Sequence, residues 1–198
     1  MLGMTRERII RSARQVFSEV GYDATTFQTI ATRAGLTRPA INYYFGNKRT
    51  LYREITESTT AMVVSAAVRA ASEAPTLSTQ LSTLIDAIIR ASAEDRSIAA
   101  FFTTSLLESQ RHQEWRDDDD HALAAIRQFV TWSVDAAIER GELAPETNAS
   151  ALAEMLLALV WGIAFYAGFL DNSEELAEVT AELRRLLPGP LGALPGAP

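Results

Sequence analysis

Apolar residues recur at spacings of three and four along almost the whole chain, which is the period of amphipathic helices. Alternating β-branched segments are absent, so the sequence predicts an all-α fold. At the start of the chain the pattern predicts three helices, at residues 5–20, 27–34 and 38–45. Gly21 and Gly35 supply stops after the first two, because glycine readily adopts the left-handed conformation that ends a helix. Thr26 and Thr37 stand where the N-caps of the second and third helices belong.

Six longer helices are expected to follow, for a total of nine. They are predicted at residues 48–72, at 77–93, at 96–109, from the end of a polar interruption (111–121) to 140, from 148 to 170, and at 173–187. Pro75 separates the first two of these helices, because proline breaks a helix interior. The resulting domains are a small N-terminal domain (1–52), a larger helical domain (53–188) joined to it by the 48–72 helix, and a Pro- and Gly-rich tail (189–198) that we expect to be disordered.

The longest uncharged apolar run is Met155–Leu170, which has 16 residues. A usual membrane span needs about 20 residues, so we expect a buried core or interface helix here and no membrane contact. The N-terminus carries Arg6, Arg8 and Arg11 where a signal segment would be apolar. Cysteine is absent, which excludes disulfides and cysteine nucleophiles and fits a reducing cytoplasm.

Charge is distributed very unevenly along the chain, whose net charge is −7. Residues 1–55 contain nine basic and four acidic residues, a balance of +5, whereas the remainder contains nine basic and 21 acidic residues, a balance of −12. A basic end on an acidic body indicates that the first part meets a polyanion while the rest is repelled by it.

The segment 25–52 carries the candidate chemistry. Two short helices that meet at Gly35 form a helix-turn-helix arrangement, whose second helix enters the DNA major groove. Ile41 and Phe45 are expected to anchor that second helix, which leaves Arg38 and Asn42 on the opposite face to contact bases or phosphates. The predicted DNA-binding residues are Thr26, Gln28, Thr37, Arg38, Pro39, Asn42, Tyr43, Tyr44 and Lys48.

These residues carry a close resemblance to a known family. The segments RERIIRSARQVFSEVGYDATT, QTIATRAGLTRPAI and YYFGNKRTLY resemble, in order and spacing, the N-terminal domain of the TetR family of bacterial transcription repressors. The resemblance covers about the first 55 residues. The sequence departs from the family at Asn42, where a tyrosine is usual, and at Tyr44, where a histidine is common.

The resemblance implies a homodimer that binds a palindromic DNA operator and releases it when a small-molecule effector enters the larger domain. It also implies that the last two helices form the dimer interface, for which we predict Leu156, Val160, Tyr166, Phe169 and Leu183. Two-fold symmetry of the protein matches two DNA half-sites about one helical turn apart.

An apolar or aromatic effector is expected, because the larger domain is rich in aromatic residues at helical spacing. The predicted lining residues are Phe101, Phe102, Leu106, Trp115, Phe129, Trp132, Trp161 and Phe165. Aromatic residues at such spacing are more often plain core than ligand wall, so we expect several of the eight, not all, to line a pocket. Phe165, Tyr166 and Phe169 fit the dimer interface equally well.

No catalytic, cofactor or metal site is predicted. His112 and His121 flank Glu114 and Asp117–Asp120, but consecutive acids cannot all face one ion, and such a run is usually a solvated loop. P-loop, GxSxG, HExxH and paired-cysteine motifs are absent, so the sequence does not support an enzyme. The alternative to a repressor is a helical binding or scaffold protein whose basic end meets another acidic partner, and salt-dependent binding to palindromic DNA separates the two.

Overall fold

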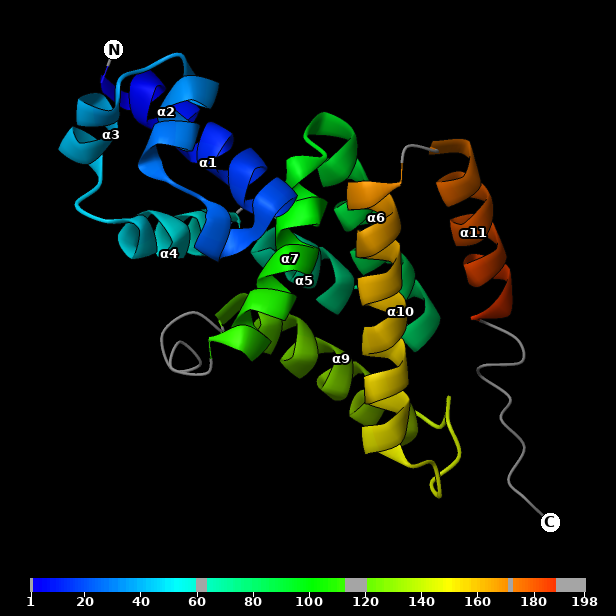
Figure 1. The fold of residues 1–198 in the computed structure, drawn as a ribbon. Coiled ribbons are helices and arrows are strands. Elements are labelled where there is room, and N and C mark those ends of the chain that lie inside the picture. Colours follow the sequence, from blue (N-terminus) through cyan, green and yellow to red (C-terminus); the bar gives the residue numbers. More distant parts are fainter. Residues whose placement is uncertain (1, 60–63, 113–120, 171–172, 188–198) are drawn as a thin grey trace.

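The computed structural model describes residues 2–59, 64–112, 121–170 and 173–187. These residues form ten helices and no strands (Figure 1). In chain order they are α1 (Leu2–Ala24), α2 (Phe27–Ala34), α3 (Arg38–Tyr44), α4 (Lys48–Thr59), α5 (Ser65–Ser72), α6 (Leu77–Glu94), α7 (Ser97–Arg111), α9 (His121–Glu139), α10 (Ala149–Phe169) and α11 (Ser173–Leu186). The predicted all-α class is confirmed.

Eight of the nine expected helices each correspond to one observed helix. The expected 48–72 helix corresponds to α4 and α5, which flank residues 60–63 outside the described part of the chain. The predicted stop at Gly21 is a non-helical residue with φ 78° and ψ 175°, after which one more turn runs to Ala24. The expected disordered tail, 189–198, lies outside the described residues.

The head, which we define as α1–α3 with the N-terminal half of α4, has its own hydrophobic core. Ile9, Phe17, Ile30, Ile41 and Leu51 are each fully buried there, one or two from each helix. On the surface, the Arg33 guanidinium of α2 pairs with both carboxylate oxygens of Glu19 on α1, at 2.5 and 2.7 Å. The apolar sides of these four helices therefore face one another and form one small core.

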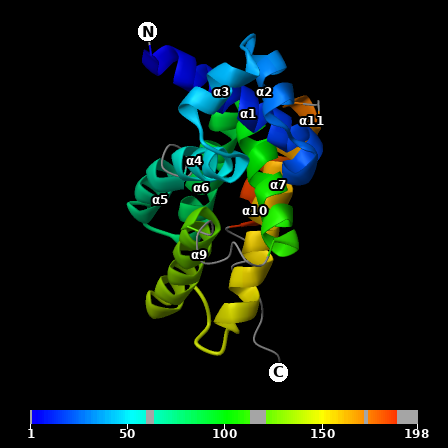
Figure 2. The same cartoon turned by 60° about the vertical axis from the view of Figure 1, so that its left-hand side comes forward.

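The body, which we define as α5–α11, is built around α10. One side of α10 is buried against α6, α7 and α9, and its buried residues are Leu152, Ala153, Leu156, Leu157, Val160, Ile163, Ala164 and Ala167. By length and composition α10 is also able to cross a membrane, but the core helix of a helical domain passes the same test. Figure 2 shows the head at one end of the molecule and the N-terminal end of α10 at the other.

Helix α7 lies between the head and α10, packed against α1 on one side and α10 on the other (Figure 1). Its contact with α10 is very close at Gly168, where an added Cβ would lie 2.4 Å from the backbone nitrogen of Ala100. Its contact with α1 begins at Arg14, whose Nε donates to Ser97 Oγ at 2.9 Å and whose NH2 lies 2.6 Å from Asp95 Oδ2. Burial raises the pKa of Asp95, but hydrogen bonds from Ser97 and Arg14 outweigh burial and hold that pKa below its usual value.

Candidate nucleic-acid interface and internal cavity

Side-chain caps and one glycine fix the relation between α2 and α3. Thr26 Oγ1 accepts a hydrogen bond from the Thr29 backbone N–H at 3.1 Å, and Thr37 Oγ1 accepts one from the Ala40 N–H at 3.4 Å. Between the two helices Gly35 has φ 61° and ψ 39°, and its N–H bonds back to the end of α2. This left-handed residue turns the chain sharply, so the two helices form the predicted helix-turn-helix.

Helix α3 has one buried and one exposed side. Ile41 is fully buried, and Phe45, the residue at its C-cap, is 2 % exposed, so both anchor the helix in the head core. Arg38, Asn42 and Tyr43 lie on the exposed side, and Tyr43 is 78 % exposed. A helix of seven residues is too short to be stable alone, so this packing is what presents the three side chains.

The other predicted DNA-binding residues, apart from Lys48, lie on α2 and α3 or cap these helices. Gln28 and Pro39 are exposed, and the half-buried Tyr44 ring meets the Tyr43 ring edge-on with the centroids 5.2 Å apart. Thr26 and Thr37 are exposed but already serve as helix caps. The Arg38 guanidinium makes no ion pair or hydrogen bond within the described residues, which leaves it available to an external anion.

Lys48 has a role that the sequence did not indicate. Its ammonium donates to the backbone carbonyls of Tyr22, Asp23 and Thr25 at 2.7, 3.2 and 3.0 Å and lies 4.2 Å from the centroid of the Tyr22 ring. Burial lowers the pKa of Lys48, although the charges of Asp23 and Glu108 act to raise it. An ammonium has three donors, and all three are used, so in this conformation Lys48 fastens α4 to the last turn of α1 and to Thr25 and offers no donor to a phosphate.

We expect Lys48→Met to destabilise the protein by about 2 kcal/mol, because three backbone carbonyls lose a charged donor. Thermal unfolding of the variant measures this loss. Arg53→Met on the exposed side of α4 is the matched control, since its weak ion pair with Glu57, at 3.8 Å, contributes little. An unchanged unfolding midpoint for Lys48→Met would contradict the fastening role.

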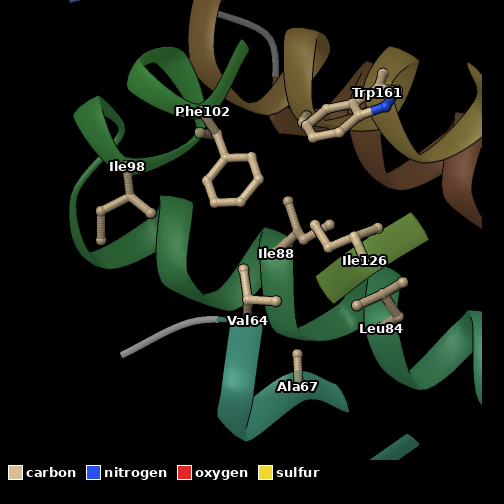
Figure 3. A pocket seen from close by; sticks show the side chains of 10 residues that line it. Val64, Ala67, Leu84, Ile88, Ile98, Phe102, Ile126 and Trp161 are labelled. Atoms are coloured by element: carbon tan, nitrogen blue, oxygen red, sulfur yellow. The ribbon is translucent and has the colours of Figure 1, made fainter. Parts of the chain in front are cut away.

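An apolar cavity lies in the body between α5, α6, α7, α9 and α10 (Figure 3). Its lining residues are Val64, Ala67, Leu84, Ile88, Ile98, Ala99, Phe102, Ile126, Trp161 and Ala164, all aliphatic or aromatic. The Phe102 and Trp161 rings, both part of its wall, stack on each other with centroids 5.6 Å apart and planes inclined by 27° (Figure 3). The cavity volume is about 20 Å³, which is room for about one water molecule.

Two of the eight predicted lining residues, Phe102 and Trp161, line this cavity. Phe101 points the other way and packs on Tyr52 of the head core, with ring centroids 5.3 Å apart. Four more of the predicted residues do not line it: Phe129 is buried in the body core, Leu106 is half-buried, and Trp132 and Phe165 are exposed. The eighth, Trp115, lies outside the described residues.

Sequence reasoning missed the aliphatic majority of the cavity wall. Leu84 and Ile88 on α6, and Ile98 and Phe102 on α7, are each four residues apart and so share one helix side. That spacing is a usable signal, but many other aliphatic pairs of the chain have it too. The prediction relied on aromatic residues, so it included only Phe102 and Trp161 of the cavity wall.

Two predicted dimer-interface residues are placed elsewhere. Leu156 and Val160 are 3 % and 1 % exposed and pack in the core of their own protomer, so they do not face a partner. Leu183 is partly buried against the same core, and Tyr166 is half-buried. Phe169, at 42 %, is exposed, as are Met155 at 39 % and Phe165 at 43 % on the same helix.

The described residues contain no group of three or more His, Asp or Glu side chains placed to hold a metal ion. Of the histidine and acidic residues considered from the sequence, Glu114 and Asp117–Asp120 lie outside the described part of the chain. His112 lies instead at the contact between head and body, 3.4 Å from Asp23.

A basic helix-turn-helix head, joined to a helical body that encloses an apolar cavity, defines a DNA-binding protein with a second domain suited to a small molecule. Residues 9–55 match the family model for bacterial regulatory proteins of the tetR family, and residues 78–183 match that of the tetracyclin repressor-like C-terminal domain. The chain belongs to the TetR family.

Individual relatives agree with this assignment. The chain is 30 % identical over 169 residues to the HTH-type transcriptional repressor BepR of Brucella suis, an alignment that covers 80 % of this chain and 78 % of BepR. The fold is similar to that of FadR from Bacillus subtilis, solved with stearoyl-CoA, with a TM-score of 0.74, 20 % identity and coverage of 91 % and 96 % of the two chains. It is also similar to that of AibR, solved with isovaleryl coenzyme A and operator DNA, with a TM-score of 0.73, 16 % identity and coverage of 93 % and 98 %.

Proposed function

We propose that this protein is a transcriptional repressor that binds a palindromic DNA operator as a homodimer and releases it when a small, apolar effector enters the body. The observation that carries the proposal is the position of α7. Two adjacent residues of this helix serve the two parts of the molecule, since Phe101 packs in the head core and Phe102 lines the cavity. A molecule that displaces Phe102 therefore also displaces a residue on which the head rests.

The effector, or the part of it that enters the cavity, is apolar, because no charged side chain of the described residues lines the cavity to pair with an ionised group. A cavity of about 20 Å³ is far smaller than the roughly 300–1,000 Å³ of usual ligand sites. Binding must therefore push the lining helices apart. A closed, effector-free body is the form that we assign to DNA binding.

Homodimerisation is proposed through the exposed side of α10. Met155, Gly162, Phe165 and Phe169 succeed one another at steps of seven, three and four residues, so they lie along one side of the helix. Met155, Phe165 and Phe169 are each about two-fifths exposed, and the rings of the two phenylalanines stack with centroids 5.3 Å apart. Large apolar side chains that are contiguous and exposed usually mark a contact surface.

We expect Arg38→Ala to weaken operator binding by about 10- to 100-fold, because an arginine that contacts a guanine edge discriminates by about 1–3 kcal/mol. The probe is a palindromic duplex selected from a random pool with the purified protein, and binding is titrated against salt. Binding to a duplex of random sequence should fall much less, since it depends on phosphate contacts.

Arg69→Ala is the control, because this exposed arginine lies in the body, on α5. Equal losses on palindromic and random DNA for Arg38→Ala would make Arg38 a phosphate contact and not a base contact. If the wild-type protein selects no palindrome and binds no DNA in a salt-dependent manner, the repressor proposal fails and the scaffold alternative gains support.

A further inference from the structure

Glu108, on the side of α7 that faces the head, is a buried carboxylate that the helix-turn-helix and the cavity do not use. The residue is 1 % exposed. Its Oε1 accepts a hydrogen bond from the Tyr22 backbone N–H at 3.2 Å, across the contact between body and head. Arg111 NH1 lies 3.3 Å from the same oxygen. Burying a carboxylate costs several kcal/mol unless it is well paired, so stability alone gives little reason for an acid here.

The turn of the head is shaped to receive this carboxylate. Gly21 has φ 78°, a conformation that favours glycine, and a Cβ at this position would lie 2.8 Å from Glu108 Oε1. Glycine therefore adopts this left-handed conformation without strain and leaves the carboxylate its present position beside the Tyr22 N–H, whereas a side chain here would displace it. The requirement at Gly21 and the burial of Glu108 are two independent features of one contact.

Tyr22 is held from both sides by opposite charges. Its N–H donates to Glu108 on the body, and its carbonyl accepts from the Lys48 ammonium, at 2.7 Å, at the start of α4. The Tyr22 ring adds to this contact, since it stacks on Phe17 of the head core and meets His112, the C-cap residue of α7, edge-on, with centroids 5.9 and 5.6 Å apart. A shift of α7 along its axis would thus be transmitted to both α1 and α4.

Other charged groups lie beside the hydrogen bond between Glu108 and the Tyr22 N–H. His112 Nε2 lies 3.6 Å from Glu108 Oε2 and 3.4 Å from Asp23 Oδ1, so it sits between an acid of the body and an acid of the head. Glu108 Oε2 itself has no hydrogen-bond partner within the described residues. The carboxylate is therefore held to the head mainly by one backbone N–H.

We propose that Glu108 is a positioning residue that fixes the orientation of the head on the body through the Gly21–Tyr22 turn. The proposal rests on the proposed repressor function, because head orientation sets the separation of the two α3 helices in a dimer. Filling of the cavity at Phe102 would move α7, and the contact of Glu108 with the Tyr22 N–H would pass this movement to the head. Loss of this contact leaves a folded protein whose head takes several orientations.

The absence of cysteine from the chain makes a direct test practical. Gln28→Cys on α2 and Glu139→Cys at the end of α9, both at exposed positions, allow one spin label on the head and one on the body. The labelled protein is mixed with an excess of unlabelled protein, so that pulsed dipolar spectroscopy reports the distance within one protomer. The comparison is made in Glu108→Gln and Glu108→Ala backgrounds, with the exposed Glu178→Gln on α11 as the control.

We expect a single narrow distance in the wild type and in Glu178→Gln, and a broadened or shifted distribution in Glu108→Ala. Glu108→Gln keeps an acceptor oxygen but not the charge, so its distribution should be intermediate. Its thermal unfolding midpoint should be equal to or above that of the wild type, because a buried charge is removed. Affinity of Glu108→Ala for the selected palindrome should fall about 10-fold or more, in line with the cost of a lost hydrogen bond to a charged group, and affinity of Glu108→Gln should fall by less.

An unchanged distance distribution in both Glu108→Gln and Glu108→Ala would overturn the proposal. A broadened distribution in Glu108→Gln would also overturn it if the thermal unfolding midpoint of this variant fell below that of the wild type, because the head would then move through loss of stability. If Glu108→Ala does not fold, the Gln variant decides by the same criteria. Failure of the wild type to bind any palindrome would reject the repressor function alone, because the distance measurement requires no DNA.

Discussion

Gly168→Ala is expected to destabilise the protein severely, whereas Gly162→Ala, six residues earlier on the same helix, is expected to leave the folded protomer intact. A Cβ at Gly168 would lie 2.4, 2.7 and 2.9 Å from the Ala100 nitrogen, the Ala100 Cα and the Ala99 carbonyl carbon. All three are backbone atoms, so relief requires α7 and α10 to move apart. Overpacking of this kind costs about 1–3 kcal/mol or more. Replacing a helical glycine by alanine gains about 1 kcal/mol, and we expect the cost to exceed this gain because the clash involves backbone atoms.

The pair is a matched comparison, because both substitutions add one methyl group to α10 and both raise its helix propensity equally. A Cβ at Gly162 meets no atom within 4 Å in the described protomer. Chemical denaturation at protein concentrations low enough to give monomers should therefore show a stability loss for Gly168→Ala and a small gain or no change for Gly162→Ala, which lies on the proposed dimer surface. Equal stabilities for the two variants would mean that α7 and α10 are not in the close contact described above.

This comparison matters for function because α7 connects the cavity to the head. The helix is held at Gly168 on one side, at Arg14 and Tyr22 on the other, and it contributes Phe102 to the cavity wall. Because α7 is closely packed on both sides, it cannot move away from a filled cavity without moving its neighbours, since close-packed interiors transmit strain. The tight contact at Gly168 thus favours movement of the head in response to an effector.

The head could be predicted from the sequence almost completely, because its signals are local. Thr26 and Thr37 cap the helices that they precede, and Gly35 adopts the left-handed conformation expected at the turn. Ile41 and Phe45 anchor α3 because residues four apart share one side of a helix. Each of these features depends on neighbours within a few residues, so the amino-acid order is sufficient.

The body could not be predicted to the same depth, because its features depend on contacts between distant segments. The 16-residue apolar run of α10 is hydrophobic on all sides, so its pattern does not show that Val160 faces its own core while Phe165 faces outward. Phe101 and Phe102 are neighbours of one type, and only the position of the head separates their roles. The head has one feature of the same kind, since Lys48 finds its carbonyl partners more than 20 residues away, which no local pattern indicates.

The double substitution Phe165→Glu/Phe169→Glu is expected to convert the protein to a monomer and to lower its affinity for the palindromic operator by at least about 100-fold. Two linked heads bind two half-sites with a high effective concentration, and separated heads lose that advantage without losing any contact to the DNA. Carboxylates placed at the centre of an apolar contact surface would be buried without partners, which prevents association. Sedimentation analysis measures the mass, and titration of the selected palindrome measures the affinity.

Trp132→Glu is the matched control for this prediction, because Trp132 is an equally exposed aromatic residue, at 47 %, on a different helix, α9. It should leave the dimer and operator affinity unchanged, while a duplex with one half-site should bind the wild type and the α10 variant with similar affinity. A dimer that survives both α10 substitutions but is lost with Trp132→Glu would move the interface to α9. Retention of the dimer in both the α10 variant and Trp132→Glu would show that the exposed side of α10 is not the contact surface. The other side of α10 is buried within the protomer at Leu156 and Val160, so α11 would be the next helix to test.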